Sequence, residues 1–117
     1  MKFNVLITLF LISGAAWSQL NSEAQLLKDN YASIYANIKI LVAKDWEGDH
    51  KMMVYGINKQ AEAFFEMSTY MDSVDYDERI MENAVSEWSE TINDKMCTDF
   101  KMVVYTYKRQ LQAKGSY

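Results

Sequence analysis

The chain carries one stretch of sequence twice, at a displacement of 50 residues. Asp49 to Ala63 reads DHKMMVYGINKQAEA and Asp99 to Ala113 reads DFKMVVYTYKRQLQA, so seven of fifteen aligned residues are identical. Two unrelated segments of ordinary composition would share roughly one residue over this length. The repeat therefore predicts two tandem copies of one structural unit.

The N-terminal residues 1–18 have the pattern of an export signal. A lysine precedes an apolar run over residues 3–16, and Ala16, Trp17 and Ser18 fit the small-x-small cleavage rule. We expect cleavage after Ser18, which leaves residues 19–117 as a single helical domain. An uncleaved anchor is disfavoured because the apolar run is short for a bilayer span. The predicted location is the periplasm or the extracellular medium.

Apolar residues of the mature chain recur at spacings of three and four, the period of an amphipathic helix. The pattern predicts one helix from an N-cap at Ser22 to the region of residues 45–48, and a second from a cap at Asp49 to Met71. Gly56 weakens the second helix by about 1 kcal/mol relative to alanine. The two predicted seams are Leu20, Ala24, Leu27, Tyr31, Ile34, Ile38 and Leu41, and Met53, Ile57, Gln60, Phe64, Met67 and Met71.

The second half of the chain shows two further apolar stripes after a predicted connection at residues 72–77. The stripes are Met81, Val85, Trp88 and Ile92, followed by Phe100, Val103, Tyr107 and Leu111. No proline or glycine lies between Tyr76 and Lys114, so a single long helix is the alternative. The repeat favours a break at residues 94–98, because residues 93–98 match the predicted turn at residues 43–48. The predicted fold is all-α: a four-helix bundle of two tandem αα-hairpins, at about residues 22–71 and 77–113.

A β-strand interpretation of both copies is the alternative. The segments KMMVY and FKMVVYTY are rich in β-forming residues and partly alternate. However, strong helix formers follow each of them without a turn signal, at residues 60–67 and 108–114. We therefore predict helices at both places.

A basic and aromatic stripe is repeated on the outer face of the predicted helices. It consists of Lys51, Tyr55 and Lys59 in the first copy and of Lys101, Tyr105 and Arg109 in the second. At about 100° per residue these side chains lie away from the apolar seam. They are interpreted either as solvated residues kept from a duplicated ancestor or as two equivalent patches for a protein or an anionic polymer.

Two glutamines, Gln60 and Gln110, occupy matched positions within the apolar seams. A buried amide needs hydrogen-bond partners, or it costs roughly 1–3 kcal/mol. Either the two amides pair across a pseudo-twofold axis, or both lie at the edge of the seam and reach water.

Catalytic, cofactor and metal signatures are not found in the sequence, so we predict no enzyme activity, no cofactor and no metal site. The only histidine is His50, and no second histidine or HxxE motif accompanies the helical carboxylates. The formal net charge of −4 argues against nucleic-acid binding. The single Cys97 cannot form an intrachain disulfide and is expected to be buried.

The predicted function is that of an exported helical binding protein without catalytic activity. Its partner is an unidentified protein or an anionic polymer, with no membrane span in the mature chain; the tyrosine-rich surface and spare thiol also permit a homodimer. The alternative is a copper or haem carrier of the cell envelope. Its soft donors would be His50 with Met52 and Met53, or Met96, Cys97 and Met102.

Overall fold

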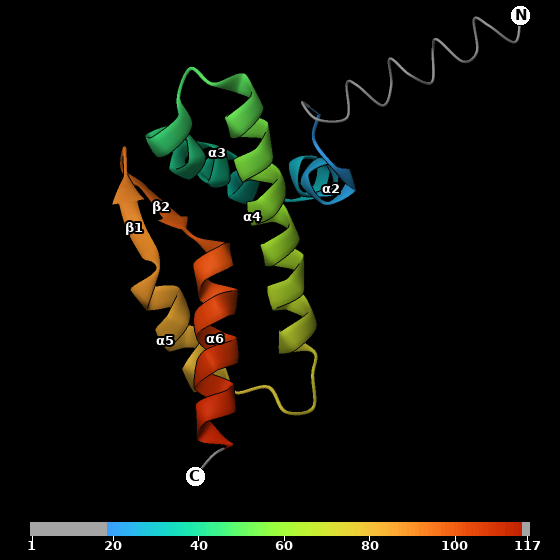
Figure 1. The fold of residues 1–117 in the computed structure, drawn as a ribbon, viewed down its shortest axis with the longest axis vertical. Coiled ribbons are helices and arrows are strands. Elements are labelled where there is room, and N and C mark those ends of the chain that lie inside the picture. The colour runs from blue at the N-terminus through green and yellow to red at the C-terminus, as the bar shows by residue number, and fades with distance from the viewer. Residues whose placement is uncertain (1–18, 116–117) are drawn as a thin grey trace, which may run out of the picture.

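The computed structural model describes residues 19–115, which form five helices and one β-hairpin (Figure 1). The elements are α2 (Ser22–Asn30), α3 (Ala32–Trp46), α4 (His50–Met71), α5 (Glu78–Glu87), β1 (Ser89–Ile92), β2 (Lys95–Thr98) and α6 (Phe100–Lys114). The predicted signal peptide, residues 1–18, lies outside the described residues. Within this range no helix combines the length and the apolar character that a membrane crossing requires.

The predicted first helix is wrong in one respect, because the structure divides it into α2 and α3. The chain bends at Tyr31, whose backbone leaves the helical region at φ −134° and ψ 57°. In Figure 1, α2 is seen end-on while α3 runs at an angle to it, across the upper part of α4. The apolar spacing continues through the bend because α2 and α3 pack into the same core: Leu27, before the bend, and Ile38, after it, belong to one hydrophobic cluster. The N-cap is Asn21 rather than Ser22: the Asn21 side chain accepts a hydrogen bond from the Ala24 amide at 2.8 Å.

Helix α4 confirms the prediction for its segment, including its first and last residues. Asp49 caps it by accepting a hydrogen bond from the Met52 amide at 3.1 Å. Gly56 lies where α3 crosses α4, and a Cβ atom added there would be 2.6 Å from Val42 Cγ1. The glycine therefore permits the close approach of the two helices, which the helix propensity scale alone does not reveal.

The second half contains a β-hairpin where a simple break between helices was predicted. Strands β1 and β2 pair antiparallel, with Ile92 opposite Lys95. Between them, Asn93 and Asp94 have positive φ values of 51° and 62°. Two consecutive left-handed residues form the kind of tight turn that suits the twist of a hairpin, and Asn and Asp tolerate it well. The described residues thus form five helices and a hairpin, not the four helices that were predicted. The two copies of the repeat, which follow Asp49 and Asp99, are helical as predicted and not extended.

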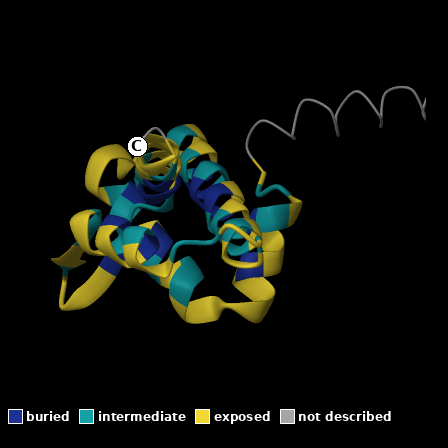
Figure 2. Cartoon of the chain, turned by 90° about the horizontal axis from the view of Figure 1, so that it is seen from below, coloured by how far each residue is buried: buried dark blue, intermediate teal, exposed yellow. Residues whose placement is uncertain are grey.

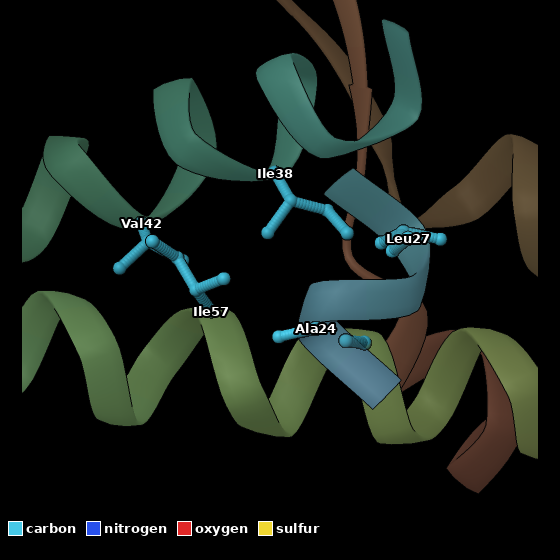
Figure 3. Packing of buried hydrophobic residues seen from close by; sticks show 6 residues of the cluster. Ala24, Leu27, Ile38, Val42 and Ile57 are labelled. Carbon is cyan, nitrogen blue, oxygen red and sulfur yellow. The ribbon is translucent and has the colours of Figure 1, made fainter. Parts of the chain in front are cut away.

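Two hydrophobic clusters lie along α4, and Figure 2 shows buried positions on helix faces that turn toward the interior. Figure 3 shows the first cluster, in which α2, α3 and the first half of α4 contribute Ala24, Leu27, Ile38, Val42, Ile57 and Ala61. The second cluster contains Met81, Ala84, Val103 and Tyr107 from α5 and α6, with Met67 and Tyr70 of α4 packed against it. Helix α4 therefore belongs to both clusters, and α6 lies beside it (Figure 1).

Candidate functional site

A groove of about 630 Å³ opens between the two halves of the molecule. It is bounded by the last turn of α3, the first half of α4, the end of α5, the start of β1 and the start of α6. Its lining residues are Leu41, Val42, Lys44, Asp45, Trp46, Met52, Tyr55, Gly56, Lys59, Gln60, Glu87, Trp88, Ser89, Glu90, Asp99, Lys101 and Met102. This volume lies within the range typical of small-molecule sites.

Three aromatic rings line the groove: Trp46, Tyr55 and Trp88. The side chains of Trp46 and Tyr55 are 43% and 51% exposed. Trp88 is half-buried, and its indole Nε1 donates a hydrogen bond to Thr106 Oγ1 at 2.8 Å, which fixes the orientation of the ring. None of the three rings contacts another aromatic ring of residues 19–115, whereas the phenylalanines of the first core pair edge to face. The groove therefore presents aromatic faces that no other ring of the described chain covers.

The charged residues of the groove are partly paired. Lys44 Nζ lies 2.5 Å from Glu90 Oε1, and this hydrogen bond with the Glu90 charge raises the pKa of the Lys44 ammonium. Lys59 pairs with Glu62, which is outside the groove lining, at 3.6 Å. Asp99 Oδ1 accepts hydrogen bonds from Gln60 Nε2 and from the Met102 amide. The other three charged side chains of the lining, Asp45, Glu87 and Lys101, have no hydrogen bond or ion pair with any residue in the described range. They are free to bond with a ligand.

The two halves of the groove are built alike. The Asp49 amide donates a hydrogen bond to the Trp46 carbonyl at 3.0 Å, and the Asp99 amide donates one to the Trp88 carbonyl at 2.9 Å. Each tryptophan follows an acidic residue, Asp45 or Glu87, which also lines the groove. The third residue after each capping aspartate is a methionine, and both methionines, Met52 and Met102, line the groove as well.

The predicted stripe residues fall into two groups. Tyr55, Lys59 and Lys101 line the groove, so residues from both copies meet there. Lys51, Tyr105 and Arg109 lie on α4 and α6 outside the lining, and all three are exposed. Within each copy the basic residue packs over the tyrosine four residues earlier: Lys59 Nζ and Arg109 Cζ each lie 5.6 Å from the ring centroid. The predicted binding role of the stripe remains a prediction.

The two matched glutamines do not pair with each other, and neither of the two alternatives holds for both of them. Gln60 is buried, and its Nε2 donates to Asp99 Oδ1 at 2.8 Å while its Oε1 accepts from the Phe100 amide at 2.7 Å. Gln110 is exposed. Gln60 of the first copy therefore holds the helix start of the second copy, at the floor of the groove.

Of the soft donors proposed for copper or haem, Met52 and Met102 both line the groove, whereas the two on β2 do not share a face. Met96 and Cys97 are neighbours on β2, where successive side chains point to opposite faces; Met96 is 60% exposed and Cys97 is fully buried, as expected. Burial raises the pKa of the Cys97 thiol, and the charge of Glu90 adds to this effect. His50 is exposed on the first turn of α4. Within residues 19–115 there is no group of three or more His, Cys, Asp or Glu side chains that could hold a metal ion.

The tryptophans were missed as site residues. Trp88 stands on a predicted apolar stripe, where large aromatic residues usually pack into the core, and it does pack against the second hydrophobic cluster while also lining the groove. Trp46 lies outside all of the predicted stripes. A sequence signal exists, but the repeat offset hides it: Trp46 and Trp88 are 42 residues apart, whereas Asp49 and Asp99 are 50 apart. The difference arises because residues 89–98 form the β-hairpin where the first half has only the two residues 47–48.

Comparison of the chain with models of protein families, with curated proteins and with solved structures gave no match.

Proposed function

We propose that this protein is an exported binding protein without catalytic activity, built from two copies of one helix-pair unit. The first copy is α3 with α4, and the second is α5 with α6, into which the β-hairpin is inserted. One observation carries the proposal: each half contributes an acidic residue, a tryptophan and a methionine to the same groove. Export to the periplasm or the medium is inferred from the N-terminal sequence pattern.

The charge of the groove bears on the kind of partner. Three lysines and four carboxylates line it, and the ion pair between Lys44 and Glu90 removes one charge of each sign. Lys101 is then the only groove lysine among the described residues without a carboxylate partner. This balance supports an uncharged partner in the groove over the anionic polymer that the stripe by itself suggests.

The proposal is tested by capture of a ligand on the mature chain, residues 19–117. The wild-type protein is immobilised and incubated with a cell-envelope extract and with spent medium of the source organism, and retained molecules are identified by mass spectrometry. We expect a ligand that the wild type retains and that a Trp46→Ala/Trp88→Ala variant loses, because the variant lacks both groove rings.

The matched control is Tyr105→Ala/Arg109→Ala, which removes an exposed ring and charge outside the groove. It should retain the ligand as the wild type does. Circular dichroism and thermal unfolding must show that both variants fold. Equal retention by the wild type and the tryptophan variant, or no retention at all, would contradict the proposal.

A further inference from the structure

The groove contains two similar subsites, one at the end of α3 and one at the end of α5. Each consists of a tryptophan ring and the carboxylate that precedes it in the sequence: Trp46 with Asp45, and Trp88 with Glu87. We propose that these subsites bind a neutral oligosaccharide, with one sugar ring against each tryptophan. This inference rests on the proposed binding function and names the class of its ligand.

The aromatic rings provide the stacking surface that a sugar ring requires. One face of a pyranose ring carries mainly C–H groups, and these pack favourably on the electron-rich face of an indole. Trp46 is 43% exposed, whereas Trp88 is half-buried because it also packs against the second hydrophobic cluster; neither tryptophan ring is paired with another ring of residues 19–115. The hydrogen bond from Trp88 to Thr106 holds that ring in place before binding, which lowers the entropy cost of association.

The carboxylates provide acceptors for the hydroxyl groups of the ligand. Asp45 and Glu87 make no hydrogen bond within the described range, so both can accept from sugar hydroxyls, and such charge-assisted bonds are stronger than neutral ones. Lys101, which also lines the groove, can donate to a hydroxyl or ring oxygen. A sugar therefore satisfies both the aromatic and the polar part of the lining.

Other ligand classes fit less well. A polyanion would meet Asp45, Glu87 and Asp99 against a single unpaired lysine. A purely apolar ligand would remove water from Asp45 and Glu87 without giving either carboxylate a partner. An oligosaccharide has no net charge and many hydroxyl donors, and it avoids both costs.

The test uses fluorescence, because both tryptophans of the mature chain line the groove. The folded mature protein is titrated with neutral gluco-, manno-, xylo- and N-acetylglucosamine oligosaccharides of increasing length, and affinity is measured in parallel by calorimetry. We expect at least one series to give a saturable change in emission, with a disaccharide or longer chain binding more tightly than its monosaccharide.

Substitutions assign the binding to the two subsites. Trp46→Ala and Trp88→Ala should each raise the Kd roughly tenfold or more, and Asp45→Asn and Glu87→Gln should raise it by smaller factors. Calorimetry measures these effects where a fluorescent residue has been removed. Leu26→Ala is the control and should leave the Kd unchanged, because Leu26 is an exposed residue of α2 outside both the groove and the basic stripe.

Heparin, polyglutamate and choline serve as charged competitors. If no neutral oligosaccharide binds, the sugar proposal is overturned. If one of the charged probes binds in a manner that depends on the tryptophans, the sugar proposal also falls while the binding function stands. Only failure of the capture experiment described above would count against the function itself.

Discussion

At the scale of single residues, Gln60 and Gln110 show how one sequence position acquires two roles. Both occupy the same position of the repeat, but only Gln60 is buried, where it bonds the Asp99 side chain and the Phe100 amide. We predict that Gln60→Ala lowers the free energy of unfolding by roughly 1–3 kcal/mol, because it leaves buried polar groups without partners. Gln110→Ala, the matched control, should change it by less than about 0.5 kcal/mol.

Urea unfolding of both variants, followed by circular dichroism, measures this difference. A similar loss of stability in the two variants would show that the two glutamines have equivalent surroundings, contrary to the structure. The sequence placed both glutamines in the seam, but it could not show which one is covered. That depends on the position of α6, which starts beside the middle of α4 and leaves Gln110 near its own free end (Figure 1).

At the scale of elements, the crossing of α3 over α4 depends on Gly56. In an isolated helix, alanine would be favoured over this glycine by about 1 kcal/mol. Here the added Cβ would be 2.6 Å from Val42 Cγ1, on the side chain of a buried residue. We predict that Gly56→Ala destabilises the protein by about 1–3 kcal/mol, the usual cost of overpacking, as measured by urea unfolding.

A double-mutant cycle with Val42→Ala separates two effects of Gly56→Ala: the steric clash with the Val42 side chain and the higher helix propensity of alanine. On the Val42→Ala background the clashing methyl groups are gone, so Gly56→Ala should be neutral or stabilising. If Gly56→Ala lowers stability equally on both backgrounds, the close contact with Val42 is not the reason for the glycine.

Elements with both an apolar period and a capping residue could be predicted from the sequence. Helix α4 and the start of α6 follow from the aspartates Asp49 and Asp99 and from the spacing after them. The bend at Tyr31 could not be predicted, because apolar spacing indicates which side chains are buried but not whether the axis continues straight. The hairpin was missed because its turn at Asn93 and Asp94 lacks the glycine that usually marks such turns.

The candidate site was predictable only in part, because the repeat places side chains on a helix face but does not give the direction of the element that follows. Tyr55, Lys59 and Lys101 could be placed on an outer helix face by the repeat, and the structure brings these three into one groove. Trp46 and Trp88 lie at helix ends, where the direction of the next element decides whether a ring is covered. That direction is set by the two-residue link in one half and by the hairpin in the other.

At the scale of the whole molecule, the two hydrophobic clusters are joined in the middle of α4. The ring of Phe64 in α4 lies 5.2 Å from that of Phe100, the first residue of α6, and Gln60 bonds the same helix start. Because α4 packs into both clusters, opening either one removes the support of a helix on which the other depends. The two halves should therefore unfold together rather than as separate units.

The two groove tryptophans allow this to be measured in each half. In the mature chain, Trp88→Phe leaves Trp46 as the reporter for the α3 side, and Trp46→Phe leaves Trp88 as the reporter for the α5 side. For each variant we predict a single urea transition whose midpoint by fluorescence coincides with its midpoint by circular dichroism. If the urea midpoint by fluorescence differs from the midpoint by circular dichroism in either variant, the two halves open independently. In that case the groove between them would exist only as long as the weaker half stays folded.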